Sequence, residues 1–386
     1  MQRALVIAEV ALSIVPLASG GLMLRSFRNL VSAPIGFDPS HILTAKLPMS
    51  FRMYPETDRR WAVHREILER VAALPGVEQV IAASPLPLAP AQITMRVGRA
   101  DRPGVPGILA TEQVALYGYL RLLGTTLLEG RDFTPEDIAA KRAVAIVDER
   151  LARRLWPEGA LGKHLAIEHA GGAREDLEVI GVTAAVRATS VRDENIAHFV
   201  VPYHVYPIDM TLVAKTRQTA VLLAPAIQSA VAASHTTRAA FDIRPMSDYV
   251  TDSIGDARFT MWVLAAFAAA SVLLAAVGLY GTLAYLIAQR TREFGIRLAL
   301  GSTVRAIVAM VMREGALLAA AGAALGLAGA SAVTGAIRQL LYNVSPFDGT
   351  TLLGVVAVVA LVAVAAAGVP AWRATRIEPN AALRSE

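Results

Sequence analysis

Four long apolar runs constrain the fold of this 386-residue chain more than any other feature of its sequence. A helix needs about 20 apolar residues to cross the hydrocarbon core of a bilayer at 1.5 Å per residue. Runs of that length lie at residues 4–24, 259–289, 315–337 and 349–372. The second has no formal charge over 31 residues, and the third has none over 23. We therefore expect an α-helical membrane protein with four transmembrane helices.

The first run, residues 4–24, has features of both a signal peptide and a membrane span. It follows Arg3 and holds small residues at 18–21, but the apolar region of a signal peptide is only about 7–15 residues long. The sequence LRSFRNL follows in place of a cleavage site, so we read the run as an uncleaved span. Its Glu9 would cost up to about 3 kcal/mol at the membrane centre. The carboxylate either extends to the cytoplasmic interface or faces the other half of an assembly.

The basic excess of the chain belongs to the membrane portion. Lys plus Arg number 37 against 32 Asp plus Glu, a net charge of +5. Residues 25–258 hold 27 basic and 26 acidic residues, and the rest of the chain holds 10 and 6. The membrane portion thus carries +4 of the +5. A high pI can indicate nucleic-acid binding, but this distribution predicts a membrane topology and no nucleic-acid partner.

The positions of those ten basic residues predict the orientation of the spans. With four spans the two termini share one side of the membrane. That side holds nine of the ten basic residues, and only Arg338 lies in the opposite short loop. Cytoplasmic loops are enriched in Lys and Arg, so we expect cytoplasmic termini in the inner membrane of a bacterium. The same rule makes 290–314 a cytoplasmic segment and 373–386 a cytoplasmic tail, and it places the large domain outside.

Residues 25–258 are expected to form a periplasmic α/β domain inserted between the first and second transmembrane helices. Runs rich in Val and Ile favour strands, whereas apolar residues at helical spacing favour helices. The predicted strands are 42–47, 77–83, 143–147 and 177–186, and the predicted helices are 58–73, 219–233 and 245–256. Two lobes are expected, divided near Pro85 to Pro90 and again near 171–176.

No catalytic, metal or cofactor site is expected in this chain. It has no cysteine, which excludes disulfides, thiol catalysis and Cys-ligated zinc. The pairs His164 with His169 and His198 with His204 lack a carboxylate at ligand spacing, so metal binding is disfavoured. The sequence contains no G-x-S-x-G, and LGKH at 161–164 lacks the upstream glycine of a phosphate loop. We expect a protein that is not an enzyme and does not bind ATP itself.

The basic segment after the second span contains the most specific motif. A short basic helix there is also typical of a membrane-surface anchor. However, residues 292–301, REFGIRLALG, resemble R-E-(I/F)-G-I-R-x-A-(L/M)-G, a signature of MacB/FtsX-like ABC-transporter permeases. The resemblance extends along most of the chain, in particular to the second half of large duplicated permeases of the MacB-like group. The blocks that carry it are residues 4–30, 74–88, 119–137, 144–165, 273–293 and 370–386.

This resemblance implies a permease, or mechanotransmission, subunit that works with a separate ATP-binding subunit and a second permease copy or homologous half. ATP would be bound by the partner ATPase, and an amphiphilic substrate would be exported or extracted. By position in the motif, the coupling element against the ATPase would comprise Arg292, Glu293, Gly295, Ile296, Arg297, Ala299 and Gly301. The alternative is an FtsX-like signalling protein that regulates a periplasmic cell-wall hydrolase. A membrane-anchored periplasmic enzyme is disfavoured because no catalytic set is present.

Glycines in the spans predict close helix packing. Gly322 and Gly326 form a G-x-x-x-G pattern, which lets helices approach closely, and Gly278 and Gly281 are expected to act similarly. Contact within the four spans and contact between two copies both remain open. Many relatives carry an amphipathic segment before the first span, whereas only Met1 to Arg3 precede it in this sequence. The chain is therefore expected to be a split half, a truncated unit or a partner of another permease chain, embedded in membrane lipid.

Overall fold

The computed structural model describes residues 2–374 with several gaps and forms two compact units. The gaps are residues 48–55, 170–172, 194, 204–208, 218, 235–239, 291–292, 294–295, 298–299, 301, 338–340 and 346. One unit, here called the membrane unit, comprises Met1–Ser32 and Asp256–Glu386. The other, here called the α/β unit, comprises Ala33–Gly255.

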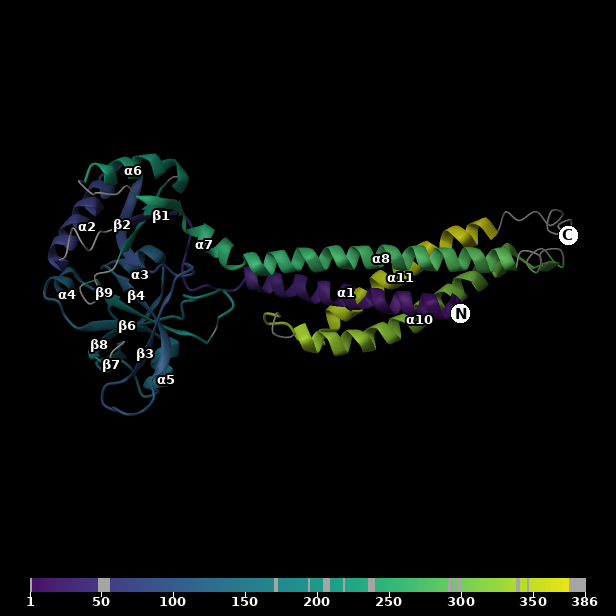
Figure 1. The fold of residues 1–386 in the computed structure, drawn as a ribbon, viewed down its shortest axis with the longest axis horizontal. Helices are drawn as coiled ribbons and strands as arrows, with labels where there is room; N and C mark the ends of the chain where they lie inside the picture. Colours follow the sequence, from purple (N-terminus) through teal and green to yellow (C-terminus); the bar gives the residue numbers. More distant parts are fainter. Residues whose placement is uncertain are drawn as a thin grey trace. The chain divides into compact units, whose positions relative to one another are not determined.

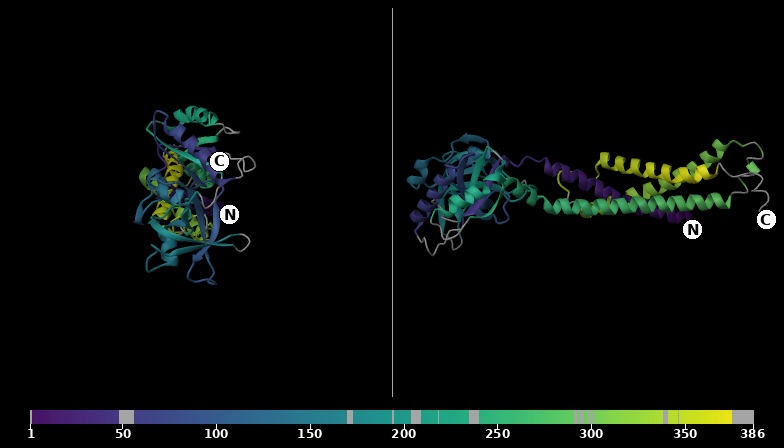
Figure 2. Two further views of the ribbon diagram at one scale, coloured as in Figure 1. Left: turned by 90° about the vertical axis from the view of Figure 1, so that its left-hand side faces the viewer. Right: turned by 90° about the horizontal axis from the view of Figure 1, so that it is seen from above.

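Four long helices build the membrane unit, and each is long and apolar enough to cross a membrane. They are α1 (Gln2–Val31), α8 (Gly255–Gln289), α10 (Val304–Ile337) and α11 (Gly349–Ala374). The helices run side by side in both views (Figures 1 and 2). The four helices predicted from the apolar runs are therefore present. Several boundaries differ: α1 extends to Val31, α8 begins at Gly255, and α10 begins at Val304, because the last part of segment 290–314 continues the helix of the third run.

The core of the membrane unit lies along one face of α1. Val6, Val10, Ile14 and Ala18 are buried and recur every fourth residue, so they share a face of the helix. They pack with apolar side chains of the other three helices, including Leu279 of α8, Leu318 and Ala319 of α10, and Val355 and Ala363 of α11. One face of the first helix thus shares a core with the other three helices.

The α/β unit is built on one mixed sheet of eleven strands. Its strands are β1 (Ile42–Leu47), β2 (Val77–Ser84), β3 (Ile93–Arg99), β4 (Ile108–Ala115), β5 (Leu127–Gly130), β6 (Val144–Asp148), β7 (His164–Glu168), β8 (Arg174–Thr183), β9 (Ala197–Pro202), β10 (Met210–Thr216) and β11 (Phe241–Pro245). Their order is β11-β1-β10-β2-β4-β3-β7-β8-β6-β9, with β5 beside β8. Because β9 also pairs with β4 in parallel, six strands close into a ring, and β11, β1, β10 and β2 extend from it.

Short helices complete the α/β unit (Figure 1). They are α2 (Thr57–Ala72), α3 (Tyr119–Leu123), α4 (Pro135–Ala139), α5 (Glu149–Leu155), the 3-10 helix η1 (Ala220–Leu223), α6 (Ala224–Ala232) and α7 (Met246–Ser253). Ile67 and Val71 of α2 and Ile227 and Val231 of α6 enter the same apolar core as the strands. The predicted α/β class is confirmed, as are the helix at 58–73 and the strand at 42–47.

One of the two predicted lobe boundaries is wrong. The Pro-rich stretch lies between β2 and β3, where the chain passes from the open part of the sheet into the ring. The second boundary, expected near 171–176, falls between β7 and β8, which are antiparallel neighbours. The chain returns from the ring to the open part of the sheet between β9 and β10. Arg174 to Asp176 belong to strand β8 itself, so the described part of this second expected boundary lies within the sheet.

Candidate functional site

The structure describes part of the predicted coupling element. Arg292, Gly295, Ala299 and Gly301 lie outside the described residues, whereas Glu293, Ile296 and Arg297 are helical. The backbone N–H of Leu300 donates to Ile296 O at 3.0 Å, and that of Ser302 donates to Arg297 O at 2.9 Å. The described part of the motif therefore ends as a helical turn just before α10.

Arg297 connects this turn to two other side chains. Its Nη2 lies 2.5 Å from Oε1 of Glu293, four residues earlier, and its Nη1 lies 3.5 Å from Sδ of Met310 on α10. Pairs spaced i,i+4 stabilise a helix by about 0.2–0.5 kcal/mol. Ile296 and Leu300 are 42% and 82% exposed, so apolar surface lies next to the ion pair.

Glu314 of α10 is a second charged centre near this segment. It accepts a hydrogen bond from Arg3 at the start of α1, and its Oε2 lies 3.7 Å from Nη1 of Arg290 at the end of α8. One carboxylate therefore joins three helices at the end of the bundle that carries the motif. Sequence reasoning missed this residue, although Glu314 is the only acidic residue in 304–337. Its isolation between arginines was the available signal.

Glu9 packs against Gly278 of α8. A Cβ built on Gly278 would lie 1.7 Å from Oε2 of Glu9, so only glycine leaves room for the carboxyl group. That oxygen is buried and has no hydrogen-bond partner among the residues that the structure describes. Gly281 differs, because a Cβ there would meet no atom within 4 Å. Gly281 lies three residues further along α8, about 4.5 Å along the helix axis, and is not in a close helix contact among the described residues.

Gly322 and Gly326 of α10 lie against α1. A Cβ on Gly322 would be 2.6 Å from Cβ of Val10, and one on Gly326 would be 2.8 Å from the carbonyl oxygen of Ala11. Both distances are shorter than real Cβ contacts allow, so the two glycines set the separation of α10 from α1. The G-x-x-x-G pattern is thus occupied by a contact within one chain.

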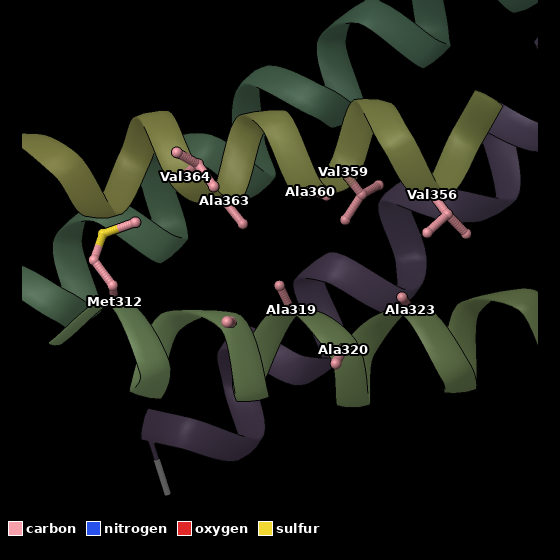
Figure 3. Close-up of a pocket in the computed structure, with 10 residues that line it drawn as sticks. Met312, Ala319, Ala320, Ala323, Val356, Val359, Ala360, Ala363 and Val364 are labelled. Atoms are coloured by element: carbon pink, nitrogen blue, oxygen red, sulfur yellow. The ribbon is translucent and has the colours of Figure 1, made fainter. Parts of the chain in front are cut away.

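A small apolar pocket separates α10 from α11 (Figure 3). It has a volume of about 220 Å³. Ala319 and Ala323 of α10 face Val359 and Ala363 of α11 across it. Its lining consists only of Met, Ala and Val side chains, so no polar group there would orient a ligand. We regard it as a packing gap between small side chains.

The opposite end of the membrane unit is held by polar contacts that the sequence did not reveal. Arg25 of α1 pairs with Asp348, which precedes α11. Oδ2 of Asp348 accepts a hydrogen bond from Thr351 N at 2.8 Å, and hydrogen bonds from Thr351 and Thr350 hold the pKa of this carboxyl below its usual range. Asn29 Nδ2 donates to Asn343 O at 3.0 Å. The described part of the α10–α11 connection therefore folds onto α1.

In the α/β unit the described residues include no group of three His, Asp or Glu side chains placed to hold a metal ion. The distance between His198 and His204, one of the two histidine pairs considered above, is not described, because His204 lies outside the described residues. His198 and His64 are buried. Burial, with Arg60 nearby, lowers the pKa of His64 to about 4, and burial, with Arg150 nearby, lowers that of His198 to about 3. Both are therefore neutral at physiological pH.

Glu112 of β4 gives a testable pH dependence. Burial, helped by the charge of Glu175, raises the pKa of Glu112 from 4.5 to about 7. The folded state then holds this proton more tightly than the unfolded chain, so the stability that the group contributes is full below about pH 4.5 and is lost as the pH rises through 7. We expect Glu112→Gln to be more stable than the wild type by about 3 kcal/mol at pH 8 and by less than about 1 kcal/mol at pH 5. Urea unfolding of residues 33–255 at both pH values measures this, and an equal difference at the two values would contradict it.

Two family descriptions match most of the chain. Residues 5–239 match the MacB-like periplasmic core domain, and residues 265–379 match the FtsX-like permease C-terminal region. The first match alone covers more than half of the sequence.

Curated relatives are export proteins. A pyoverdine export ATP-binding/permease protein, PvdT, of Pseudomonas entomophila (strain L48) is 26% identical over 331 residues, which are 83% of this chain and 48% of that protein. A macrolide export ATP-binding/permease protein, MacB, of Marinobacter nauticus is 29% identical over 224 residues, which are 55% of this chain and 34% of that protein. The chain spans about half the length, or less, of these relatives.

Among solved structures, the periplasmic region of MacB from Actinobacillus actinomycetemcomitans is similar to this chain with a TM-score of 0.39 and 14% identity, covering 59% of this chain and 98% of that one. The extracellular domain of the ABC-type transporter YknZ from Gram-positive bacteria has a TM-score of 0.36 and 19% identity, covering 53% and 98%. The match at residues 5–239 contains most of the first candidate span and most of the α/β unit. The match at residues 265–379 contains most of the second span and all of the third and fourth. The chain belongs to the MacB/FtsX-like family of ABC-transporter permeases.

Proposed function

We propose that this chain is the mechanotransmission subunit of an ABC transporter in the bacterial inner membrane. In this proposal the α/β unit lies in the periplasm, inserted between the first and second spans at 4–24 and 259–289, and both termini are cytoplasmic. The third and fourth spans are 315–337 and 349–372. The bias of the arginines toward one side and the order of the two family matches support this topology.

The observation that carries the proposal is the set of polar contacts around segment 290–314. Arg297 contacts both Glu293 and Met310, and Glu314 joins α10 to the start of α1 and the end of α8. Closure of an ATPase dimer on ATP would displace the exposed side chains of Ile296 and Leu300. These contacts would pass the displacement to α1 and α8, which lead directly into the α/β unit. A differential interaction of a few kcal/mol is sufficient to shift such an equilibrium.

The partners follow from the same proposal. A separate ABC subunit would bind ATP, and a second permease copy or homologous half would complete the assembly. Exposed Phe259, Trp262 and Phe267 on α8 provide apolar surface for that neighbour and for lipid. Since relatives are named for pyoverdine and macrolide export, the proposed cargo is an amphiphilic molecule that is exported or extracted on the periplasmic side.

The second candidate function is FtsX-like signalling to a periplasmic cell-wall hydrolase. The match of residues 265–379 to the FtsX-like permease region favours it for the membrane portion. The match of residues 5–239 to the MacB-like periplasmic domain favours export. Export requires cargo release driven by ATP, whereas signalling requires hydrolase activation without cargo movement.

The test is affinity purification of the full chain from a mild detergent, followed by ATPase and substrate-release assays on the reconstituted complex. We expect a phosphate-loop ATPase to co-purify and its activity to rise on reconstitution with the permease. Recovery of a cell-wall hydrolase whose activity depends on the chain, without cargo release, would support signalling instead. Recovery of the chain with no ATPase that it stimulates would overturn the proposal.

Glu9 offers a prediction within this function. Because its carboxyl group packs against Gly278 inside its own bundle, we expect Glu9→Gln to change export by less than about twofold. Gly278→Leu should instead displace the Glu9 side chain and lower the yield of folded protein. ATP-driven release from proteoliposomes measures both variants. A tenfold loss in Glu9→Gln with normal yield would show that the charge itself acts in transport.

A further inference from the structure

A large groove opens between α1, α8 and α11 in the membrane unit. Its volume is about 1400 Å³. It lies at the end of the bundle where α1 leads into residue 33, opposite the end that carries the coupling segment. The lining residues fall within 17–31 of α1, Ser32 after it, 261–272 of α8 and 350–358 of α11.

The length of the groove corresponds to one leaflet of a bilayer. At 1.5 Å per residue, its α8 and α11 walls run for about 17 Å and about 12 Å along the helices, and the part of its α1 wall within the predicted span, residues 17–24, runs for about 10 Å. The hydrocarbon core is about 30 Å thick, so the groove covers about half of it. An occupant that enters from the membrane would therefore come from a single leaflet.

The walls of the groove are apolar, with small residues where the helices meet. Gly21 of α1 lies against Thr351 of α11, where a Cβ would be 2.9 Å from Cγ2 of Thr351. Gly20 faces the backbone of Leu264 on α8, where a Cβ would be 3.3 Å from the carbonyl oxygen. These contacts hold the three helices together. Gly354 of α11 lines the groove, and a Cβ there would meet no atom within 4 Å.

The end of the groove nearest residue 33 is polar and carries a net positive charge. Arg25, Arg28 and Asn29 all line it. Arg25 pairs with Asp348, and Asn29 donates to a backbone carbonyl. The guanidinium of Arg28 is exposed and has no ion-pair or hydrogen-bond partner within the part of the chain that the structure describes. Two arginines against one aspartate leave one positive charge.

Trp262 stands on the α8 wall and is 63% exposed. Tryptophan is enriched at the level of lipid headgroups, and an arginine guanidinium binds phosphate through charge-assisted hydrogen bonds. The groove therefore combines apolar walls, the indole of Trp262 and the guanidinium of Arg28, which lacks a described partner. A phospholipid has the matching sequence of groups, from its acyl chains to its phosphate.

We propose that this groove binds one anionic phospholipid of the periplasmic leaflet, with its phosphate at Arg28 and its acyl chains along Ala265, Ala269, Val272 and Val358. The side of the membrane rests on the proposed function, whereas the site itself rests on the contacts above. The lipid would fill the space between α8 and α11 and hold the outer end of α1, the helix that leads into the α/β unit.

The test uses the full chain in nanodiscs of phosphatidylcholine with and without phosphatidylglycerol. Two variants address the site: Arg28→Gln removes the charge, and Gly354→Phe fills the groove from a position with open space. Each has a matched control outside the groove lining, Arg258→Gln on α8 and Gly368→Phe on α11. Lipid retained after detergent exchange is counted by native mass spectrometry, a readout that requires neither ATP nor the ATPase.

We expect the wild type and both controls to retain phosphatidylglycerol in preference to phosphatidylcholine. Arg28→Gln should lower retention about fivefold, as expected for one basic residue near an anionic headgroup, and Gly354→Phe should abolish it. Inorganic phosphate should not displace the lipid. Equal retention of both lipids, equal loss in variants and controls, displacement by phosphate, or cross-links from Gly354→Cys to a second copy of the chain would each overturn the proposal.

Discussion

Arg297→Glu is expected to abolish most of the stimulation of the partner ATPase by this chain while leaving the chain folded. The change replaces the 2.5 Å ion pair between Arg297 and Glu293 by two carboxylates spaced i,i+4, and it removes the contact with Met310. Coupling between sites is typically worth about 1–3 kcal/mol, so a loss of about tenfold in stimulated ATP hydrolysis is expected. The measurement compares hydrolysis by the complex in proteoliposomes with hydrolysis by the ATPase alone.

The matched control is Arg305→Glu. Arg305 lies in the same basic segment and is exposed, so its reversal changes the net charge of the segment equally without breaking the Arg297 contacts. Gly295→Trp should uncouple in the same way as Arg297→Glu. If Arg305→Glu reduced stimulation as much as Arg297→Glu, the segment would act through its overall charge, as a membrane-surface anchor does. Normal stimulation in Arg297→Glu would contradict the assignment of the coupling element.

Most of the architecture could be predicted from the sequence, because the signals were local and strong. Apolar runs and helical spacing predicted the four long helices and α2, and runs of Val and Ile predicted β1 and β2. The ring in the sheet was not predictable in this way. It depends on the parallel pairing of β4 with β9, whose residues are separated by more than eighty positions. Pairings this distant leave no periodicity in a single sequence.

The functional residues were harder to predict, because a motif identifies positions in the sequence but does not show which side chains they contact. Arg297 and Glu293 were found through the family signature, whereas Glu314 was overlooked because its partners, Arg3 and Arg290, come from two other helices. Gly322 and Gly278 were both identified as packing glycines. Only the structure reveals that one lies against Val10 and the other against the carboxyl group of Glu9.

The contact between α10 and α1 predicts a large loss of stability when Gly322 is enlarged. A Cβ at this position would lie 2.6 Å from Cβ of Val10 and 3.1 Å from the carbonyl oxygen of Ile7, so Gly322→Leu must push the two helices apart. Overpacking a dense core costs about 1–3 kcal/mol even for smaller additions. We expect Gly322→Leu to lose most of its monodisperse protein after heating in detergent, as measured by size-exclusion chromatography.

Two further variants identify the cause of that loss. Gly281→Leu adds the same side chain to another predicted span at a position with no atom within 4 Å, and it should behave as the wild type does. Gly322→Ala should be partly destabilised, and Val10→Ala should recover part of that loss in the double variant, because it removes the side-chain atoms behind the Val10 Cβ. Such non-additivity is expected only for residues in contact. If the effects of Gly322→Ala and Val10→Ala were simply additive, close packing of α10 on α1 at Gly322 would be excluded as the source of stability.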